Sequence, residues 1–203
     1  IDKFFSAQWR TAGCVSDLKK LDVSLYHGLS HEIPVGLHKK GVPAVVTMHD
    51  LIFERYPSQY NEIDRMIYRK KFKYAIEHAD QIIAISEQTK NDLIKFYQAP
   101  AKKISVCYQS CNPAFQLSVS GTEKDRIRKK YKLPAAFFLS VGSIIERKNL
   151  IAICKALLLL KKEERLPLVV IGNGGAYKKI VQQFIAENNL QDSILFLSEQ
   201  AST

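Results

Sequence analysis

The sequence lacks the features that mark several large classes of protein. Its longest apolar run, residues 156–160 with their neighbours, is far short of the ~18 residues that a membrane-spanning helix needs. No charged segment followed by an apolar one opens the chain, so we expect no secretion signal and a cytoplasmic protein. The apolar fraction of 46% and the absence of low-complexity segments exclude a disordered chain.

Cysteine and the common catalytic signatures are also scarce. No C-x-x-C pair and no zinc-type spacing occurs, so we predict buried or half-buried thiols in a reducing cytosol. There is no G-x-S-x-G elbow, which argues against a Ser-His-Asp hydrolase, and neither a Walker loop nor G-x-G-x-x-G. The cysteines are Cys14, Cys107, Cys111 and Cys154.

Charge of one sign is in excess. The sequence has 30 Lys and Arg residues and 20 Asp and Glu residues, which gives a formal net charge of +10. Many of the cations fall at 69–73 and 124–132, and such clusters attract the phosphates of nucleic acid and of anionic lipid about equally. Aromatic platforms of the kind that bind single strands are not arranged on a recognisable sheet motif, so nucleic acid is the less favoured partner.

Short apolar runs alternate with amphipathic stretches, which indicates strands alternating with helices. We expect helices at 63–79 and 86–97, the second capped by Ser86. This alternation favours an α/β fold with parallel sheets. The predicted strands are 23–26, 44–48, 81–85, 104–108, 137–141, 168–171 and 194–197.

A seam interrupts this rhythm near residues 112–122. Asn112 and Pro113 form a turn, and the stretch 116–122 is polar and contains glycine. We therefore predict two Rossmann-like units, residues 1–117 and 118–203. Each is shorter than a complete doubly wound domain, which carries about six strands.

Polar and small residues follow the predicted strands, at the sheet edge where parallel sheets bind ligands. In the first unit, His49 stands at a strand end and is suited to contact a sugar hydroxyl or a phosphate. In the second unit, a loop carries Arg147 and Lys148, and Asn149 starts a helix, so cations and backbone N–H groups converge on one anion. An ordinary strand–helix turn with solvated side chains explains the same spacing. The other candidates are His27, Asp50, Ser86, Gly142, Ser143, Gly172, Asn173 and Gly174.

Six stretches of the sequence, 26–34, 46–53, 79–90, 138–143, 146–150 and 170–174, together resemble the family 4 retaining glycosyltransferases of the GT-B fold. Stretches 26–34, 46–53 and 79–90 resemble the first, acceptor-side domain of that family. Stretches 138–143, 146–150 and 170–174 resemble its donor-binding domain. The Arg-Lys-Asn motif at 147–149 is similar to that of a subgroup rich in mannosyltransferases of bacterial surface polysaccharide assembly.

The resemblance implies roles for the donor-side residues. Lys148 and Arg147 would bind the diphosphate of a nucleotide sugar and neutralise the charge that grows on the leaving group. Gly142 would let the phosphate approach the backbone, and Gly172 and Gly174 would shape the nucleoside pocket. Neither a metal ion nor another cofactor is expected. The implied donor-binding set is Gly142, Ser143, Gly172, Asn173 and Gly174.

For the first unit, the resemblance implies that His49 faces the transferred sugar from the opposite domain. The implied reaction moves a hexose to a lipid-linked saccharide with retention, and the leaving phosphate acts as base. The basic surface then fits a peripheral protein on the anionic inner leaflet of the cell membrane. The implied cleft-lining residues are His27, Asp50, Ser86 and Thr89.

Departures from the family pattern are also visible. Ser143 stands where many members have Arg, so Arg147 is expected to compensate. Nothing corresponds to the Gly-rich acceptor loop or to the E-x7-E region, and the chain stops at 198–203, where the donor pocket would be completed. We therefore expect an internal piece of an enzyme, which puts the activity of these 203 residues alone in doubt.

Two other hypotheses remain open. A non-catalytic basic α/β module would bind nucleic acid or a protein partner, in a salt-sensitive way that survives loss of Lys148 or His49. An epimerase or phosphorylase of the same fold would share the donor-side residues.

Overall fold

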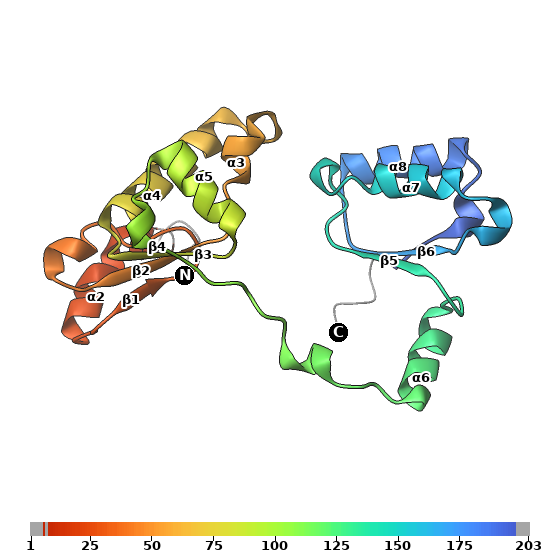
Figure 1. Cartoon of the computed structure of the whole chain (residues 1–203), viewed down its shortest axis with the longest axis horizontal. Coiled ribbons are helices and arrows are strands. Elements are labelled where there is room, and N and C mark those ends of the chain that lie inside the picture. Colours follow the sequence, from red (N-terminus) through yellow and green to blue (C-terminus); the bar gives the residue numbers. More distant parts are fainter. Residues whose placement is uncertain (1–5, 7, 198–203) are drawn as a thin grey trace. The chain divides into compact units, whose positions relative to one another are not determined.

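The computed structural model describes residue 6 and residues 8–197. The chain divides into two compact units, Ile1–Asn112 (unit 1) and Pro113–Thr203 (unit 2), and each has its own parallel sheet (Figure 1). The predicted end of the donor pocket at 198–203 lies outside the described residues.

Unit 1 is built on a sheet of four parallel strands in the order β1-β2-β3-β4. Its long helix begins where the Asn61 side chain accepts a hydrogen bond from the Asp64 backbone N–H at 2.7 Å, which satisfies one of the unpaired N–H groups of the first turn. In chain order the elements are η1 (Trp9–Gly13), α2 (Cys14–Lys20), β1 (Tyr26–Gly28), η2 (Leu37–Lys40), β2 (Ala44–Met48), α3 (Ile52–Arg55), η3 (Pro57–Gln59), α4 (Glu62–His78), β3 (Gln81–Ala84), α5 (Glu87–Tyr97), η4 (Ala101–Lys103) and β4 (Ile104–Val106).

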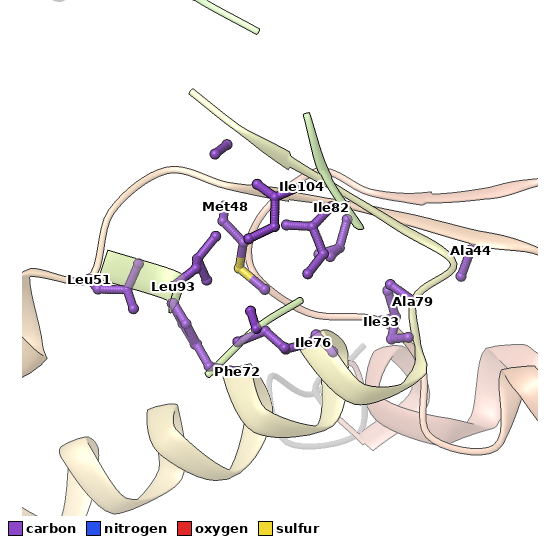
Figure 2. Packing of buried hydrophobic residues seen from close by; sticks show 14 of the residues in the cluster. Ile33, Ala44, Met48, Leu51, Phe72, Ile76, Ala79, Ile82, Leu93 and Ile104 are labelled. Atoms are coloured by element: carbon purple, nitrogen blue, oxygen red, sulfur yellow. The ribbon is translucent and has the colours of Figure 1, made fainter. Parts of the chain in front are cut away.

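The core of unit 1 lies between this sheet and its helices. Phe72 and Ile76 come from the apolar stripe of α4 and pack with Met48 of β2 and Ile82 of β3 (Figure 2). Leu93 of α5 is fully buried in the same cluster. Burial of each such side chain contributes roughly 1.5–3 kcal/mol to the stability of the unit. This packing fixes the positions of the carboxyl ends of the strands.

Unit 2 carries three parallel strands in the order β5-β6-β7, with α7 and α8 on one face of the sheet (Figure 1). Its core is separate from that of unit 1 and includes Leu157, Val170 and Val181. The elements are η5 (Pro113–Gln116), α6 (Gly121–Tyr131), β5 (Phe138–Val141), η6 (Glu146–Lys148), α7 (Leu150–Leu159), η7 (Lys162–Glu164), β6 (Leu168–Ile171), α8 (Ala176–Glu187), η8 (Gln191–Ser193) and β7 (Ile194–Phe196).

The predicted α/β class is confirmed, and each of the seven predicted strands has a counterpart. The strands expected at 44–48 and 168–171 match β2 and β6 to the residue. The first strand was predicted wrongly: it begins at Tyr26, not Val23. The Val23 N–H donates to the carbonyl of Leu18 at 3.3 Å and closes the end of α2, so sheet pairing starts only where Tyr26 meets Ala44.

Two of the four cysteines also differ from expectation. Cys14 and Cys154 are buried, whereas Cys107 and Cys111 are exposed. The prediction of buried or half-buried thiols is wrong for the second pair because both cysteines follow the end of β4 at Val106, outside the packed part of the sheet. Within the described residues, no helix combines the length and the apolar character that crossing a membrane requires.

Candidate functional site

His49 follows β2 at the carboxyl end of the sheet, and hydrogen bonds fix its position. Its backbone N–H donates to Nε2 of His31 at 3.0 Å. Its ring Nε2 lies 2.9 Å from the carbonyl oxygen of Leu29. Because a carbonyl only accepts, Nε2 must carry the proton. In the neutral ring Nδ1 is then an acceptor, with no protein partner among the described residues, which suits it to bind a hydroxyl.

The first turn of α5 holds the other side of His49. The Thr89 hydroxyl donates to the His49 carbonyl at 2.9 Å, and Thr89 is almost fully buried. Ser86 caps the helix as predicted: its Oγ accepts from the Thr89 N–H at 3.1 Å and lies 3.0 Å from the Thr89 hydroxyl. Ser86 and Thr89 therefore act together to position the backbone of His49.

The two remaining candidates of unit 1 have other contacts. Asp50 is exposed, and its Oδ1 accepts a hydrogen bond from the Ile52 N–H at 3.2 Å, at the start of α3. His27 is exposed on β1, and its Nε2 lies 2.9 Å from the hydroxyl of Thr47. Its hydrogen bond therefore goes to Thr47 and not to His49.

His31 is the residue that sequence reasoning missed. It has a positive φ of 62°, a conformation that His adopts more readily than most residues. Its own N–H donates to the Thr47 carbonyl at 3.0 Å, and its ring stacks on Phe72 with centroids 4.9 Å apart. Burial, with a smaller contribution from the nearby His49, lowers the pKa of His31. The signal in the sequence was the short return after Gly28, which brings residue 31 back beside β2.

In unit 2 the loops after β5 and β6 touch through their backbones. A Cβ at Gly172, where φ is 156°, would lie only 1.9 Å from the Gly142 carbonyl oxygen, so this close approach requires glycine. The Ile144 N–H donates to the Asn173 carbonyl at 2.8 Å, and a Cβ at Gly174 would meet the Ile144 carbonyl at 2.3 Å. Gly172, Asn173 and Gly174 thus brace the loop that carries Gly142.

A pocket of about 220 Å³ opens at the carboxyl end of β5. Gly142, Ser143 and Lys148 line it, whereas Arg147 is not among its lining residues. Lys148 and Arg147 are exposed and form no ion pair within the described part of the chain. Asn149 stands at the N-terminus of α7 with no side-chain capping bond, so the helix presents its positive end here. An unpaired lysine and a helix N-terminus at one small pocket favour an anion.

The comparisons with known proteins agree with this geometry. The family model for Glycosyltransferase Family 4 matches residues 5–115, and the model for Glycosyl transferases group 1 matches residues 122–203. Two solved structures share the fold. The Anabaena Alr3699/HepE structure in complex with UDP has a TM-score of 0.70 at 15% identity, over 94% of this chain and 52% of that one. The structure of WaaG, a glycosyltransferase involved in lipopolysaccharide biosynthesis, has a TM-score of 0.60 at 16% identity, over 92% and 51%.

The two parallel-sheet units thus have the GT-B fold of glycosyltransferases. The chain belongs to glycosyltransferase family 4. Among curated relatives, O-antigen chain mannosyltransferase B of Escherichia coli is 26% identical over 177 residues, which cover 85% of this chain and 45% of the relative. O-antigen chain mannosyltransferase RfbU of Salmonella typhimurium is 27% identical over 156 residues, covering 76% and 39%. The chain spans less than half the length of these two relatives.

Proposed function

We infer that the protein is a glycosyltransferase that moves a hexose from a nucleotide diphospho-sugar to a lipid-linked saccharide, with retention, in the assembly of a surface polysaccharide. The observation that carries this proposal is the pocket after β5, where Lys148 and the N-terminus of α7 offer positive charge that is not paired by any group among the described residues. Support for mannose as the hexose comes from the two relatives, which are O-antigen chain mannosyltransferases, and support for a nucleotide donor comes from the UDP complex of the Anabaena structure.

In this proposal, Lys148 binds the diphosphate and Arg147 adds a second charge nearby. As the bond between the sugar and the phosphate breaks, negative charge grows on the leaving diphosphate. A preorganised cation stabilises that charge more in the transition state than in the ground state, which lowers the barrier. No metal ion is needed in this scheme because the side chains supply the charge. The leaving phosphate takes the proton of the acceptor hydroxyl.

His49 is the group that we assign to the transferred sugar. Its Nδ1 accepts a hydrogen bond from a sugar hydroxyl while its Nε2–H stays bonded to the Leu29 carbonyl. His31 and Thr89 hold its backbone, and the bond from Nε2–H to the Leu29 carbonyl orients the imidazole before the sugar binds, which reduces the loss of side-chain entropy on binding. We also propose that the protein works at an anionic membrane surface, where its acceptor lies.

A binding experiment on Lys148 tests the donor site. Titration calorimetry with UDP, GDP and the corresponding glucose and mannose conjugates would show which nucleotide the chain prefers. Loss of a charge-assisted contact costs about 1.5–3 kcal/mol, so Lys148→Ala should weaken binding of the preferred nucleotide by about ten- to a hundredfold. Lys162→Ala removes an exposed lysine elsewhere in unit 2 and should leave the affinity unchanged. Equal affinity in the Lys148→Ala protein and the parent would contradict the proposed donor site.

A further inference from the structure

Unit 1 contains a pocket of about 370 Å³, whose lining residues are not part of the proposed donor site in unit 2. It lies between the return loop after β1 and the segment from β2 to α4, and Asp50, Tyr68, Lys71 and Phe72 are among its lining residues. This volume falls in the range typical of small-molecule sites, about 300–1,000 Å³. Its wall mixes aromatic rings with charged groups, so both an apolar surface and hydrogen-bonding groups face the space.

The aromatic part of the pocket is rigid on one side and open on the other. Phe53 and Phe72 are buried and meet edge to face, with ring centroids 4.9 Å apart. Tyr68 packs against Phe53 at 5.5 Å and keeps 40% of its surface exposed. An exposed ring on a fixed base offers a flat face to a ligand that has an apolar side, such as the C–H face of a sugar ring.

The polar part sets the charge that the pocket accepts. Lys71 forms an ion pair with Glu32, with Nζ and Oε2 2.5 Å apart, so its positive charge is compensated within the wall. The Asp50 carboxylate uses Oδ1 for the Ile52 N–H, and Oδ2 makes no hydrogen bond within the described residues. His31 accepts a hydrogen bond at Nε2 and is therefore neutral. The pocket thus has an excess of negative charge, which repels an anionic ligand.

The pocket also adjoins the His49 site. His31 belongs to its wall, and the rings of His31 and His49 lie 5.2 Å apart, edge to face. An occupant on the Tyr68 side of His31 would therefore sit beside the residue that we assign to the transferred sugar. A hydroxyl-rich, uncharged ligand with one apolar face satisfies all of these features, since Asp50 can accept hydrogen bonds from its hydroxyls.

We propose that this pocket binds the uncharged terminal sugar of the saccharide acceptor and discriminates against acidic sugars. That the bound sugar belongs to an acceptor rests on the proposed transferase function, whereas the binding of a sugar in this pocket does not. Stacking on Tyr68 supplies affinity, and the Asp50 carboxylate both accepts hydrogen bonds from the sugar hydroxyls and repels a uronic acid. The phosphate end of a lipid-linked acceptor lies outside this pocket.

Saturation-transfer NMR titrations of the chain test the proposal. The probes are the methyl glycosides of glucose, mannose and galactose, each paired with the methyl uronide of the same sugar. We expect at least one neutral glycoside to bind and its uronide to bind several-fold more weakly. Tyr68→Ala should weaken the neutral glycoside by about two- to tenfold, as expected for loss of one stacking contact. Tyr56→Ala is the matched control, because Tyr56 is another exposed tyrosine of unit 1 and does not line the pocket.

Asp50→Asn keeps the shape of the pocket and does not depend on packing, since Asp50 is exposed. It should narrow the preference for the neutral sugar over its uronide. The proposal is overturned if no neutral glycoside binds, if the uronides bind equally well, or if the Tyr68→Ala and Tyr56→Ala proteins behave alike. Nucleotide binding in the same samples separates the two proposals. If UDP or GDP still binds while no glycoside binds, only the proposal for this pocket is contradicted. Glycoside binding without nucleotide binding supports the pocket and contradicts the donor site.

Discussion

At the scale of single residues, the position of the His49 backbone depends on the charge of the His31 ring. Nε2 of His31 can accept the His49 N–H only while the ring is neutral. Burial and the adjacent His49 lower the pKa of His31 from the usual 6.5, although Asp50 and Glu32 oppose this shift. Partial burial, with a smaller contribution from the stacked ring of His38, lowers the pKa of His78 as well.

These shifts predict how stability depends on pH. Below pH 6.5 the unfolded chain binds protons on His31 and His78 that the folded chain does not bind. The contribution of these two histidines to the free energy of unfolding of unit 1 is therefore greatest above pH 6.5. It falls as the pH drops toward their lowered pKa values in the folded state. Urea unfolding at pH 7.5 and 5.5 measures this loss.

The matched variant is His31→Asn, because Asn also tolerates the positive φ at this position. It removes one of the two titrating rings, so its loss of stability between the two pH values should be smaller than that of the parent. An unchanged loss would show that His31 does not titrate as its surroundings imply.

Single residues also show where sequence reasoning stops. His49, Ser86 and Lys148 were predicted as candidates because each follows a strand, and the carboxyl ends of parallel strands share one edge. His31 and Tyr68 were not found as site residues. His31 lies in a loop and has a positive φ, and Tyr68 lies on α4, so their approach to Asp50 depends on packing across unit 1 that local spacing does not encode.

At the scale of elements, the first turn of α5 contributes both to the stability of that helix and to the position of His49. Ser86→Ala removes the cap, which should lower the free energy of unfolding by about 1 kcal/mol. It should also shift the NMR signals of the His49 ring, because the Ser86 hydroxyl supports Thr89, which holds the His49 carbonyl. Urea unfolding and histidine-selective spectra measure the two effects.

The control is Ser120→Ala, since Ser120 caps α6 with the same geometry, an Oγ that accepts from the Glu123 N–H at 3.2 Å. It should lower the stability of its own helix and leave the His49 signals in place. Equal shifts of the His49 signals in both variants would contradict the link between α5 and the site.

Elements with strong local signals were predicted well. The capping serine and apolar stripe of α5 placed its start at Ser86, and the continuous apolar run of β6 fixed both of its ends. The first strand failed because Val23 and Leu25 look like strand residues. In the structure the chain there is still closing α2, and Leu25 remains 54% exposed. A strand of three residues depends on pairing with its neighbour more than on its own composition.

At the scale of the whole molecule, the charge of +10 is used unevenly. On α4, Arg69 pairs with Glu54 at 2.6 Å and Lys71 with Glu32 at 2.5 Å, so these charges serve the fold. Three lysines of α6, Lys124, Lys129 and Lys130, are exposed and form no ion pair within the described residues. Charge that the fold leaves uncompensated is available to a partner surface.

We therefore predict that α6 drives binding to anionic membranes. Sedimentation with phosphatidylglycerol vesicles should show binding that falls as salt rises. A triple Lys→Gln variant at Lys124, Lys129 and Lys130 should weaken it by about a hundredfold, at about 1 kcal/mol per lysine. The same change at Lys161, Lys162 and Lys179, exposed lysines outside α6, should have a smaller effect. Single-stranded RNA in place of vesicles tests the nucleic-acid hypothesis, because tighter binding to RNA than to vesicles would favour that partner over a membrane.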